Sequence, residues 1–168
     1  MIIALTPVEA FTVASVGLRR QLLALARGHL PDGNADEDRY FDHHIFGAMA
    51  EFAVARATNL FWHASIGLDA GLDVGGCISV RLRRLPGTGT DLAIRRKDQD
   101  HVPQVLVHNH RGREFYFDLI GWLYTKEARE RGVWNERSNV WFAPPPYRSI
   151  EELIATFGNG PPSQLAAE

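Results

Sequence analysis

The hydrophobic pattern of the sequence changes once, near Asn59, and this change constrains the fold more than any other feature. Before it, apolar spacing and capping signals indicate two helices, and after it short apolar runs alternate with glycine and proline turns. Two helices, a run of strands and then short helices predict a mixed class, α/β or α+β.

The helical part contains two segments separated by a turn. Thr6 and Glu9 have the spacing of a capping box, and Pro7 stands at the first helical position, so we predict a helix from about residue 7 to 29. The turn sequence Pro-Asp-Gly-Asn at 31–34 should follow it. A second helix is predicted over about 39–58 by an apolar stripe at helical spacing, formed by Phe41, Ile45, Ala48, Met49 and Phe52.

The strand part contains six candidate segments, which are 60–66, 72–74, 77–85, 91–95, 104–109 and 114–122. Gly75-Gly76 is a two-residue turn signal and predicts a hairpin between the second and third of them. Short helices are predicted over 125–131 and 149–157, with a loop or an edge strand across 134–147 between them.

Length and composition predict an ordinary globular domain. The 168 residues, 45% hydrophobic and 23% charged, fit one domain over 1–158, in which 1–38 is an N-terminal helix with an acidic loop, 39–147 is the core and 159–168 is a mobile tail. No apolar run approaches the ~20 residues of a membrane span. Cys77 is the only cysteine, which favours a reducing compartment, so we expect a cytoplasmic protein with no membrane partner.

Charge is distributed unevenly, although the net charge is only −2. Residues 81–113 contain eight Lys or Arg against three Asp, a local charge of +5, so the rest of the chain carries −7. A basic segment on an acidic body can bind a phosphate backbone, but a salt-bridged surface has the same composition. The residues that we expect at a DNA backbone are Arg83, Arg84, Arg95 and Arg96.

Two acids and a cation could share one site. Glu51 lies on the second predicted helix, at the edge of its apolar stripe. Asp73 lies just before the Gly75-Gly76 turn, and the hairpin would place it opposite Ser79 and Arg81, which share one face of the next strand. Two carboxylates beside a cation can hold Mg²⁺, which prefers oxygen ligands. Each acid taken alone is also explained as a solvated or turn-forming residue.

Two segments resemble the PD-(D/E)XK nuclease superfamily. Residues 46–56, FGAMAEFAVAR, are similar to the helix that leads its core and carries a glutamate after small residues. Residues 71–81, GLDVGGCISVR, resemble its aspartate, hairpin and acid-any-lysine strand, in particular in phage-type members with an Asp-Val-Gly turn and a Val-Arg pair. Residues 117–122, FDLIGW, resemble a strand ending in Gly-Trp in those proteins, and the likeness covers about residues 46–145.

This resemblance implies a restriction-endonuclease-like fold with a central mixed sheet. It also implies that Glu51 and Asp73 hold Mg²⁺ or Mn²⁺, that Val80 adds its main-chain carbonyl, and that Arg81 stabilises the charge that develops on a phosphodiester. Ser79 stands where the superfamily has its second acid, and Arg81 stands where it has lysine. Serine is a poor Mg²⁺ ligand, and arginine cannot lose a proton to act as a base.

The sequence therefore predicts a DNA-acting protein, encoded by a phage or prophage and present in the host cytoplasm, that hydrolyses phosphodiesters with Mg²⁺ or Mn²⁺ if it is active. The alternative is a catalytically impaired protein on the same fold that binds a phage or host protein, such as an accessory factor or a virion component. Ser79, Arg81 and the acidic body favour this alternative. A third hypothesis, a generic domain unrelated to nucleases, would be favoured if Glu51 and Asp73 lie far apart.

Overall fold

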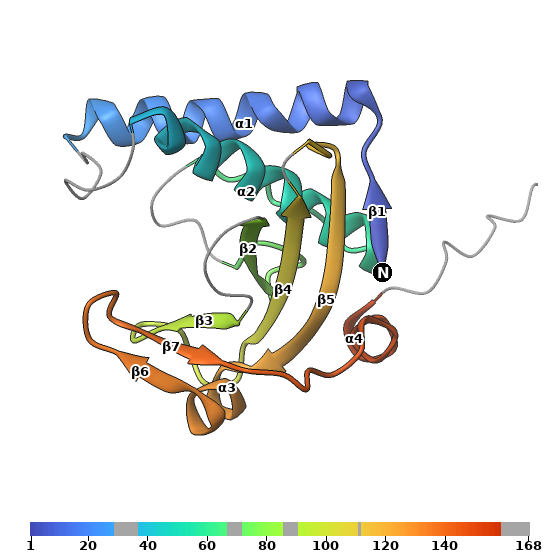
Figure 1. Cartoon of the computed structure of the whole chain (residues 1–168). Helices are drawn as coiled ribbons and strands as arrows, with labels where there is room; N and C mark the ends of the chain where they lie inside the picture. Colours follow the sequence, from blue (N-terminus) through green and yellow to red (C-terminus); the bar gives the residue numbers. More distant parts are fainter. Residues whose placement is uncertain (29–36, 67–71, 86–90, 111, 159–168) are drawn as a thin grey trace, which may run out of the picture.

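The computed structural model of the chain (Figure 1) describes residues 1–28, 37–66, 72–85, 91–110 and 112–158. Its class is mixed α+β with an N-terminal helix, as the sequence predicts. In chain order the elements are β1 (Ile2–Ala4), α1 (Pro7–Ala26), α2 (Glu37–Thr58), β2 (Ser79–Leu85), β3 (Leu92–Arg95), β4 (Pro103–His110), β5 (Tyr116–Tyr124), α3 (Thr125–Arg131), β6 (Val133–Asn135), β7 (Val140–Ala143) and α4 (Ile150–Phe157).

The strands form two sheets. The larger sheet has the order β1-β5-β4-β2, and the smaller sheet has the order β3-β7-β6. In the larger sheet β2 runs parallel to β4, whereas β4 and β5, and β5 and β1, are antiparallel, so this sheet is mixed. Figure 1 shows α2 packed along the larger sheet and α1 outside α2, while the smaller, antiparallel sheet lies beside α3 at the opposite end from α1.

Helix α1 begins as predicted and crosses α2 at close range. The Thr6 hydroxyl accepts the N–H of Glu9, and the Glu9 carboxylate accepts the N–H of Thr6, which completes the capping box. At Gly17, an added Cβ would lie 2.5 Å from both the carbonyl oxygen of His44 and the Cα of Ile45. Glycine is therefore required at this crossing, and it sets the spacing between the two helices.

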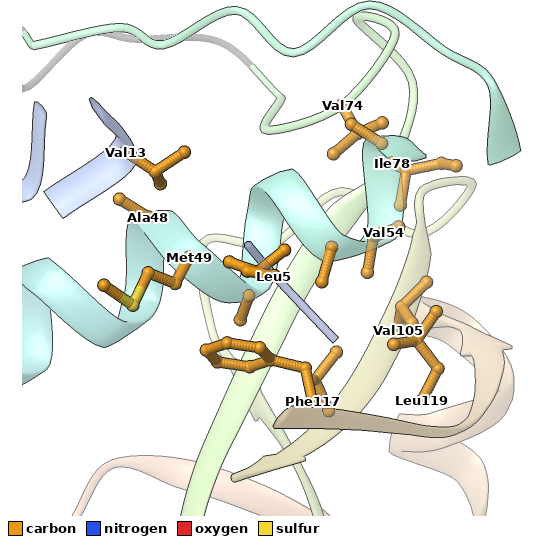
Figure 2. Close-up of a cluster of buried hydrophobic side chains, with 14 of the residues drawn as sticks. Leu5, Val13, Ala48, Met49, Val54, Val74, Ile78, Val105, Phe117 and Leu119 are labelled. Carbon is orange, nitrogen blue, oxygen red and sulfur yellow. The ribbon is translucent and has the colours of Figure 1, made fainter. Parts of the chain in front are cut away.

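The main core lies between α2 and the larger sheet (Figure 2). Helix α2 contributes small side chains that are fully buried, namely Ala48, Ala50, Ala53 and Val54, and the sheet contributes Val105, Phe117, Leu119 and Trp122. Small residues on the helix let it approach the sheet closely. A second cluster, of Leu92, Ile94, Leu106, Leu123, Ala128 and Ala143, packs the smaller sheet and α3 against β4 and β5.

The connection between α2 and β2 differs from the prediction. The segments 60–66 and 72–74 do not form strands, and their described residues make only the single-residue bridges of Trp62 with Val74 and of Val74 with Ile78. Asn59 and Ala64 have φ angles of 54° and 48°, so the chain leaves the extended conformation on both sides of Trp62. The predicted strand 60–66 is wrong for this reason, and the predicted strand 72–74 is wrong because only Val74 pairs, in single-residue bridges.

The other differences concern the ends of elements and short strands. Strand β1 is not predicted by any local pattern, because its three residues gain a strand conformation only by pairing with 116–118 of β5. The segment 134–147 is not one edge strand but contributes to the β6–β7 hairpin. Helix α1 ends at Ala26, before the predicted limit, and α2 begins at Glu37. The predicted turn at 31–34 and the tail 159–168 lie outside the described residues.

Candidate functional site

The Gly75-Gly76 turn places Asp73 beside the start of β2. Gly75 and Gly76 have φ angles of 59° and 67°, in the left-handed region that a two-residue hairpin turn requires. The N–H of Cys77 donates to the carbonyl of Val74 at 3.1 Å and closes the turn. The chain turns at Gly75-Gly76 as predicted, but Val74 pairs with Ile78, so the turn contains three residues and the predicted hairpin is reduced to this single bridge.

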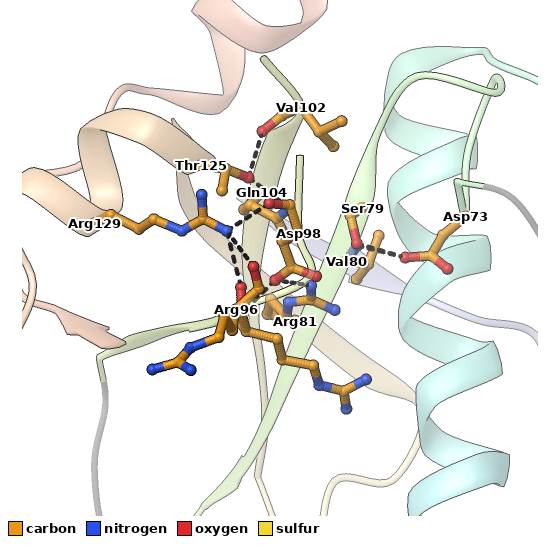
Figure 3. Close-up of polar contacts among 11 residues, drawn as sticks. Asp73, Ser79, Val80, Arg81, Arg96, Asp98, Val102, Gln104, Thr125 and Arg129 are labelled. Atoms are coloured by element: carbon orange, nitrogen blue, oxygen red, sulfur yellow. Dashed lines mark hydrogen bonds and ion pairs between the residues drawn. The ribbon is translucent and has the colours of Figure 1, made fainter. Parts of the chain in front are cut away.

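Asp73 is fixed to the first two residues of β2. Its Oδ2 accepts the N–H of Val80 at 2.7 Å and the hydroxyl of Ser79 at 3.2 Å (Figure 3). The N–H and C=O of one strand residue point to the same edge, so the Val80 carbonyl faces the edge where Asp73 lies, away from β4. The hydroxyl of Ser79 and the N–H of Val80 therefore orient the carboxylate of Asp73.

Glu51 is buried on α2 and held by a residue of α1. Arg20 donates from Nη1 to Oε1 at 2.7 Å and from Nη2 to Oε2 at 2.8 Å, and Trp62 Nε1 donates to Oε2 at 3.1 Å. The Arg20 Nε–H donates to the carbonyl of Ser65 at 2.7 Å. The side chains of Arg20 and Glu51 are only 16% and 11% exposed. A two-bond guanidinium–carboxylate pair shielded from water in this way is a strong interaction.

The charge of Glu51 acts on Asp73. Burial raises the pKa of Asp73, and the negative charge of Glu51 raises it further. The N–H of Val80, the charge of Arg81 and the hydroxyl of Ser79 oppose this rise without cancelling it. Glu51, Ser79 and Arg81 thus all act on the ionisation of Asp73.

The same site controls the ionisation of two neighbouring groups. Burial alone would lower the pKa of Arg20, but the hydrogen bonds and charge of Glu51, together with the charge of Asp73, raise it overall. Burial lowers the pKa of His44, and the positive charge of Arg20 lowers it further. Arg20 therefore stays charged, and the imidazole of His44 favours its neutral form.

Arg81 connects the acid pair to a turn after β3. Its Nη2 donates to Asp98 Oδ2 at 2.6 Å, and the same oxygen accepts the N–H of Arg95 at 2.8 Å. Arg129 of α3 donates to the carbonyls of Arg96 at 2.9 Å and Asp98 at 2.5 Å (Figure 3). The turn 95–98 is thus held from the β2 side and from the α3 side. The Nε of Arg81 is buried with no hydrogen-bond partner among the described residues.

This turn presents exposed positive charge, and we call residues Arg95, Arg96 and Lys97 the basic turn. All three side chains are exposed, and with Ser138, Asn139 and Val140 they line a hollow of about 300 Å³. The guanidinium of Arg96 lies 5.2 Å from the ring centre of Trp134 on β6. An exposed cluster of cations beside an aromatic ring is suited to contact a phosphate backbone.

Arg83 and Arg84 have partners inside the protein. Arg84 pairs with Asp42 at 2.5 Å, and its guanidinium lies 3.7 Å from the ring centre of Phe46. Arg83 donates from Nε to the carbonyl of Asp91 at 3.2 Å, and burial lowers its pKa. The four arginines expected at DNA therefore divide into an exposed pair, Arg95 and Arg96, and a half-buried pair, Arg83 and Arg84.

Three residues of the site, Arg20, Trp62 and Asp98, are not among those predicted from the sequence. Arg20 lies 31 positions from Glu51, and no local pattern connects the two. The pattern around Trp62 predicts a strand, but the chain there is irregular, with a positive φ of 48° at Ala64. The indole of Trp62 donates a hydrogen bond to Glu51 from this irregular segment. Asp98 offered a signal, because an acid three residues after Arg95 is well placed to accept a main-chain N–H in a turn.

The oxygen atoms of the site are of the chemical type that binds a hard divalent cation. The carboxylates of Glu51 and Asp73 and the carbonyl of Val80 are the oxygen ligands that Mg²⁺ prefers, with water completing its coordination. No group of three or more His, Cys, Asp or Glu gathers as a metal site within the described part of the chain. Arg20 binds both oxygens of Glu51, so a cation can use Glu51 fully only after Arg20 releases at least one of them.

The sequence matches no protein-family model, and no curated protein matches it. Of the helices that the structure describes, none combines the length and the apolar character needed to cross a membrane. The function is therefore inferred from the geometry of the site.

Proposed function

We propose that the chain acts on DNA and hydrolyses a phosphodiester at the Glu51–Asp73 pair with Mg²⁺ or Mn²⁺. The observation that supports this is the pKa of Asp73, which burial and the charge of Glu51 raise together. A buried carboxyl group whose ionisation is disfavoured gains stability from a cation bound beside it. Arg20 supplies one positive charge in the structure, and a divalent cation would supply two.

Each residue of the pair's surroundings has a role in this proposal. Glu51, Asp73 and the carbonyl of Val80 would hold the cation, which supplies electrostatic stabilisation to the phosphate and lowers the pKa of water. Ser79 keeps Asp73 aimed at the site. Arg81, held by Asp98, would stabilise the developing negative charge on the phosphate with its positive charge.

The basic turn is the proposed contact to the DNA backbone. Asp98 accepts hydrogen bonds from the side chain of Arg81 and from the N–H of Arg95. One carboxylate therefore connects the basic turn to the proposed reaction site. The order of an acid-bearing helix, an acid before a turn and a cation-bearing strand in a mixed sheet is the order in the PD-(D/E)XK resemblance. We extend the proposal to a restriction-endonuclease-like relationship and, because Cys77 is the only cysteine, to a cytoplasmic location.

A second candidate function is an impaired member of the same superfamily that binds another protein. The contact between Arg20 and both oxygens of Glu51 favours it. The guanidinium neutralises this carboxylate, so no metal ion is needed to do so. Ser79 also donates a hydrogen bond to Asp73, whereas the second acid of the superfamily would coordinate the metal ion. In this case Arg20 stays in place, and the acid pair only stabilises the fold.

Thermal unfolding with and without Mg²⁺ or Mn²⁺ separates the two candidates. In Arg20→Met the cation should restore stability, by about 1.4 kcal/mol at ten times its Kd, which is a rise in Tm of roughly 3–6 °C. The rise should be smaller in the wild type and absent in Arg20→Met with Asp73→Asn. Arg56→Met, which breaks the exposed pair of Arg56 with Glu9, is the matched control and should show no added response to the cation. No response in any variant would contradict the proposed cation site.

Cleavage assays on linear, nicked, single-stranded and branched DNA test hydrolysis itself. Activity should require Mg²⁺ or Mn²⁺ and be lost in Glu51→Gln and Asp73→Asn. Wild-type cleavage no greater than that of Asp73→Asn would favour the impaired protein. Activity of the double variant Ser79→Glu with Arg81→Lys would then locate the impairment on β2.

DNA binding is tested by charge reversal in the basic turn. Arg96→Glu with Lys97→Glu should weaken binding to unrelated sequences alike and make its salt dependence shallower, by about 0.9 in the log–log slope for each phosphate that the protein no longer neutralises. Arg27→Glu, at the end of α1, is the control and should bind as the wild type does, since α1 lies at the other end of the molecule (Figure 1). Equal binding by both variants would exclude the basic turn as the DNA contact.

A further inference from the structure

Helix α1 carries an exposed apolar stripe, which we define as Val8, Phe11, Ser15, Leu18, Leu22 and Leu25. The five apolar members are 76%, 80%, 42%, 53% and 38% exposed in this order. The six positions follow steps of three, four, three, four and three residues, which is the heptad period with which one helix packs along another. An apolar surface of this kind, interrupted only by Ser15 and running along most of a helix, is typical of an interaction site.

The opposite face of α1 already has its partners. Ala10, Val13, Gly17, Gln21 and Ala24 are buried, and Gly17 marks the close crossing with α2. Arg20 reaches Glu51 from this inner side. Figure 1 shows α1 as the outermost layer of the molecule, with α2 between it and the sheet. The stripe therefore faces outward, away from α2.

The dimensions of the stripe fit the same stripe of a second copy. A helix of 20 residues is about 30 Å long, and an identical helix supplies an equal length of heptad positions. The exposed parts of the five apolar side chains amount to on the order of 500 Å², taking ~150–250 Å² for a large side chain. Two copies would together bury up to about 1,000 Å², which reaches the lower limit for a specific interface.

An antiparallel arrangement gives the better complementarity. It sets Phe11 against Leu22 of the second copy, and Ser15 against Leu18, so that larger side chains face smaller ones. A parallel arrangement would set Phe11 against itself and Ser15 against itself. The Ser15 hydroxyl already donates to the carbonyl of Thr12 at 2.7 Å, so its burial leaves no donor unpaired. Antiparallel helices also bring the positive N-terminal end of one dipole beside the negative C-terminal end of the other.

We propose that two copies of this chain associate through the α1 stripe as an antiparallel helix pair, with a twofold axis between Ser15 and Leu18. This inference does not depend on the proposed function. The stripe lies on the face of α1 opposite Arg20, and the basic turn lies at the other end of the molecule (Figure 1). Both candidate sites stay accessible in such a dimer.

Sedimentation equilibrium of the full chain tests the association. The wild type should be a dimer at micromolar concentration, and Phe11→Glu or Leu22→Glu should raise the dimer dissociation constant at least 100-fold, because each substitution acts twice in a symmetric interface. Phe61→Glu is the matched control, since Phe61 is also an exposed phenylalanine, at 71%, outside the stripe. It should leave the dimer intact, and unchanged far-ultraviolet circular dichroism should show that all variants fold.

Cysteine cross-linking tests the orientation. In a Cys77→Ser background, a mixture of Val8→Cys and Leu25→Cys chains should form a disulfide-linked heterodimer, and neither chain alone should link to itself. Self-linking of Val8→Cys would show parallel helices and overturn the proposed geometry. The proposal would be overturned if the wild type stays monomeric at about 100 μM, which is 100 times the expected ~1 μM. It would also be overturned if the dimer is unaffected by Phe11→Glu and Leu22→Glu, and the stripe would then bind a different partner.

Discussion

Replacing Arg20 by methionine tests the central ion pair of the site. Removing one partner of a buried ion pair costs about 3–5 kcal/mol, because the other charge stays buried without compensation. The 16% and 11% exposure of the two side chains lets some water reach Glu51, and Trp62 still donates to Oε2. We therefore expect a loss of about 2–4 kcal/mol in the free energy of unfolding, which is roughly 5–12 °C in Tm for a chain of this length.

Urea unfolding monitored by tryptophan fluorescence measures this loss, and the chain contains its own control. Arg56 and Glu9 form a second pair between α2 and α1, at 3.1 Å, but their side chains are 46% and 28% exposed. Water and salt screen such a pair, so Arg56→Met should cost at most about 1 kcal/mol. Adding about 0.5 M salt should shrink the effect of Arg56→Met more than that of Arg20→Met, because a buried pair is screened less.

A double-mutant cycle identifies the cause of the loss. Arg20→Met with Glu51→Met removes both charges and replaces them by apolar groups of similar size, which is often neutral for stability. The double variant should therefore be more stable than Arg20→Met alone, with a coupling of at least about 1 kcal/mol between the two positions. Additive losses, or a loss below about 1 kcal/mol for Arg20→Met, would refute the conclusion that Arg20 neutralises a buried Glu51.

Three further predictions address the acid, the helix crossing and the turn. The pKa of Asp73 is raised, so its contribution to stability is fully present below the unfolded value of 3.8 and is lost as pH rises through the folded value. Asp73→Asn should therefore gain stability relative to the wild type as pH rises from about 4 to 7, and urea midpoints across this range would show the opposite trend if the sign were wrong. Gly17→Ala should destabilise by about 1–3 kcal/mol, because its Cβ meets α2 backbone, whereas Gly47→Ala, where no atom lies within 4 Å, should be neutral or stabilising; equal melting temperatures would contradict the close crossing. Asp98→Ala should cost about 2–3 kcal/mol in urea unfolding by leaving its arginine partner on β2 unpaired, against less than about 1 kcal/mol for the exposed Asp100→Ala, and similar losses would show that burial is not decisive here.

The candidate site was partly visible in the sequence. The Gly75-Gly76 turn fixes which residues of the following strand Asp73 can reach, and the hydrogen bonds from Ser79 and Val80 follow from that local geometry. The position of Glu51 near Asp73 depends on how α2 packs against β2, which small residues on α2 favour but do not specify. The partition of the basic arginines into exposed and internal pairs was not visible, because it depends on contacts across the fold such as that of Arg84 with Asp42.

Features that short segments carry could be predicted from the residues alone. The capping box at Thr6 starts α1, the two glycines permit a left-handed turn, and the change of period near Asn59 separates helices from strands. Features that need a distant partner depend on the packing of the whole fold. Strand β1 exists because β5 pairs with it, and Arg20 becomes the counter-ion of Glu51 because Gly17 lets α1 approach α2. A hydrogen bond or an ion pair between distant segments forms only when packing brings its groups together, and no local pattern encodes that distance.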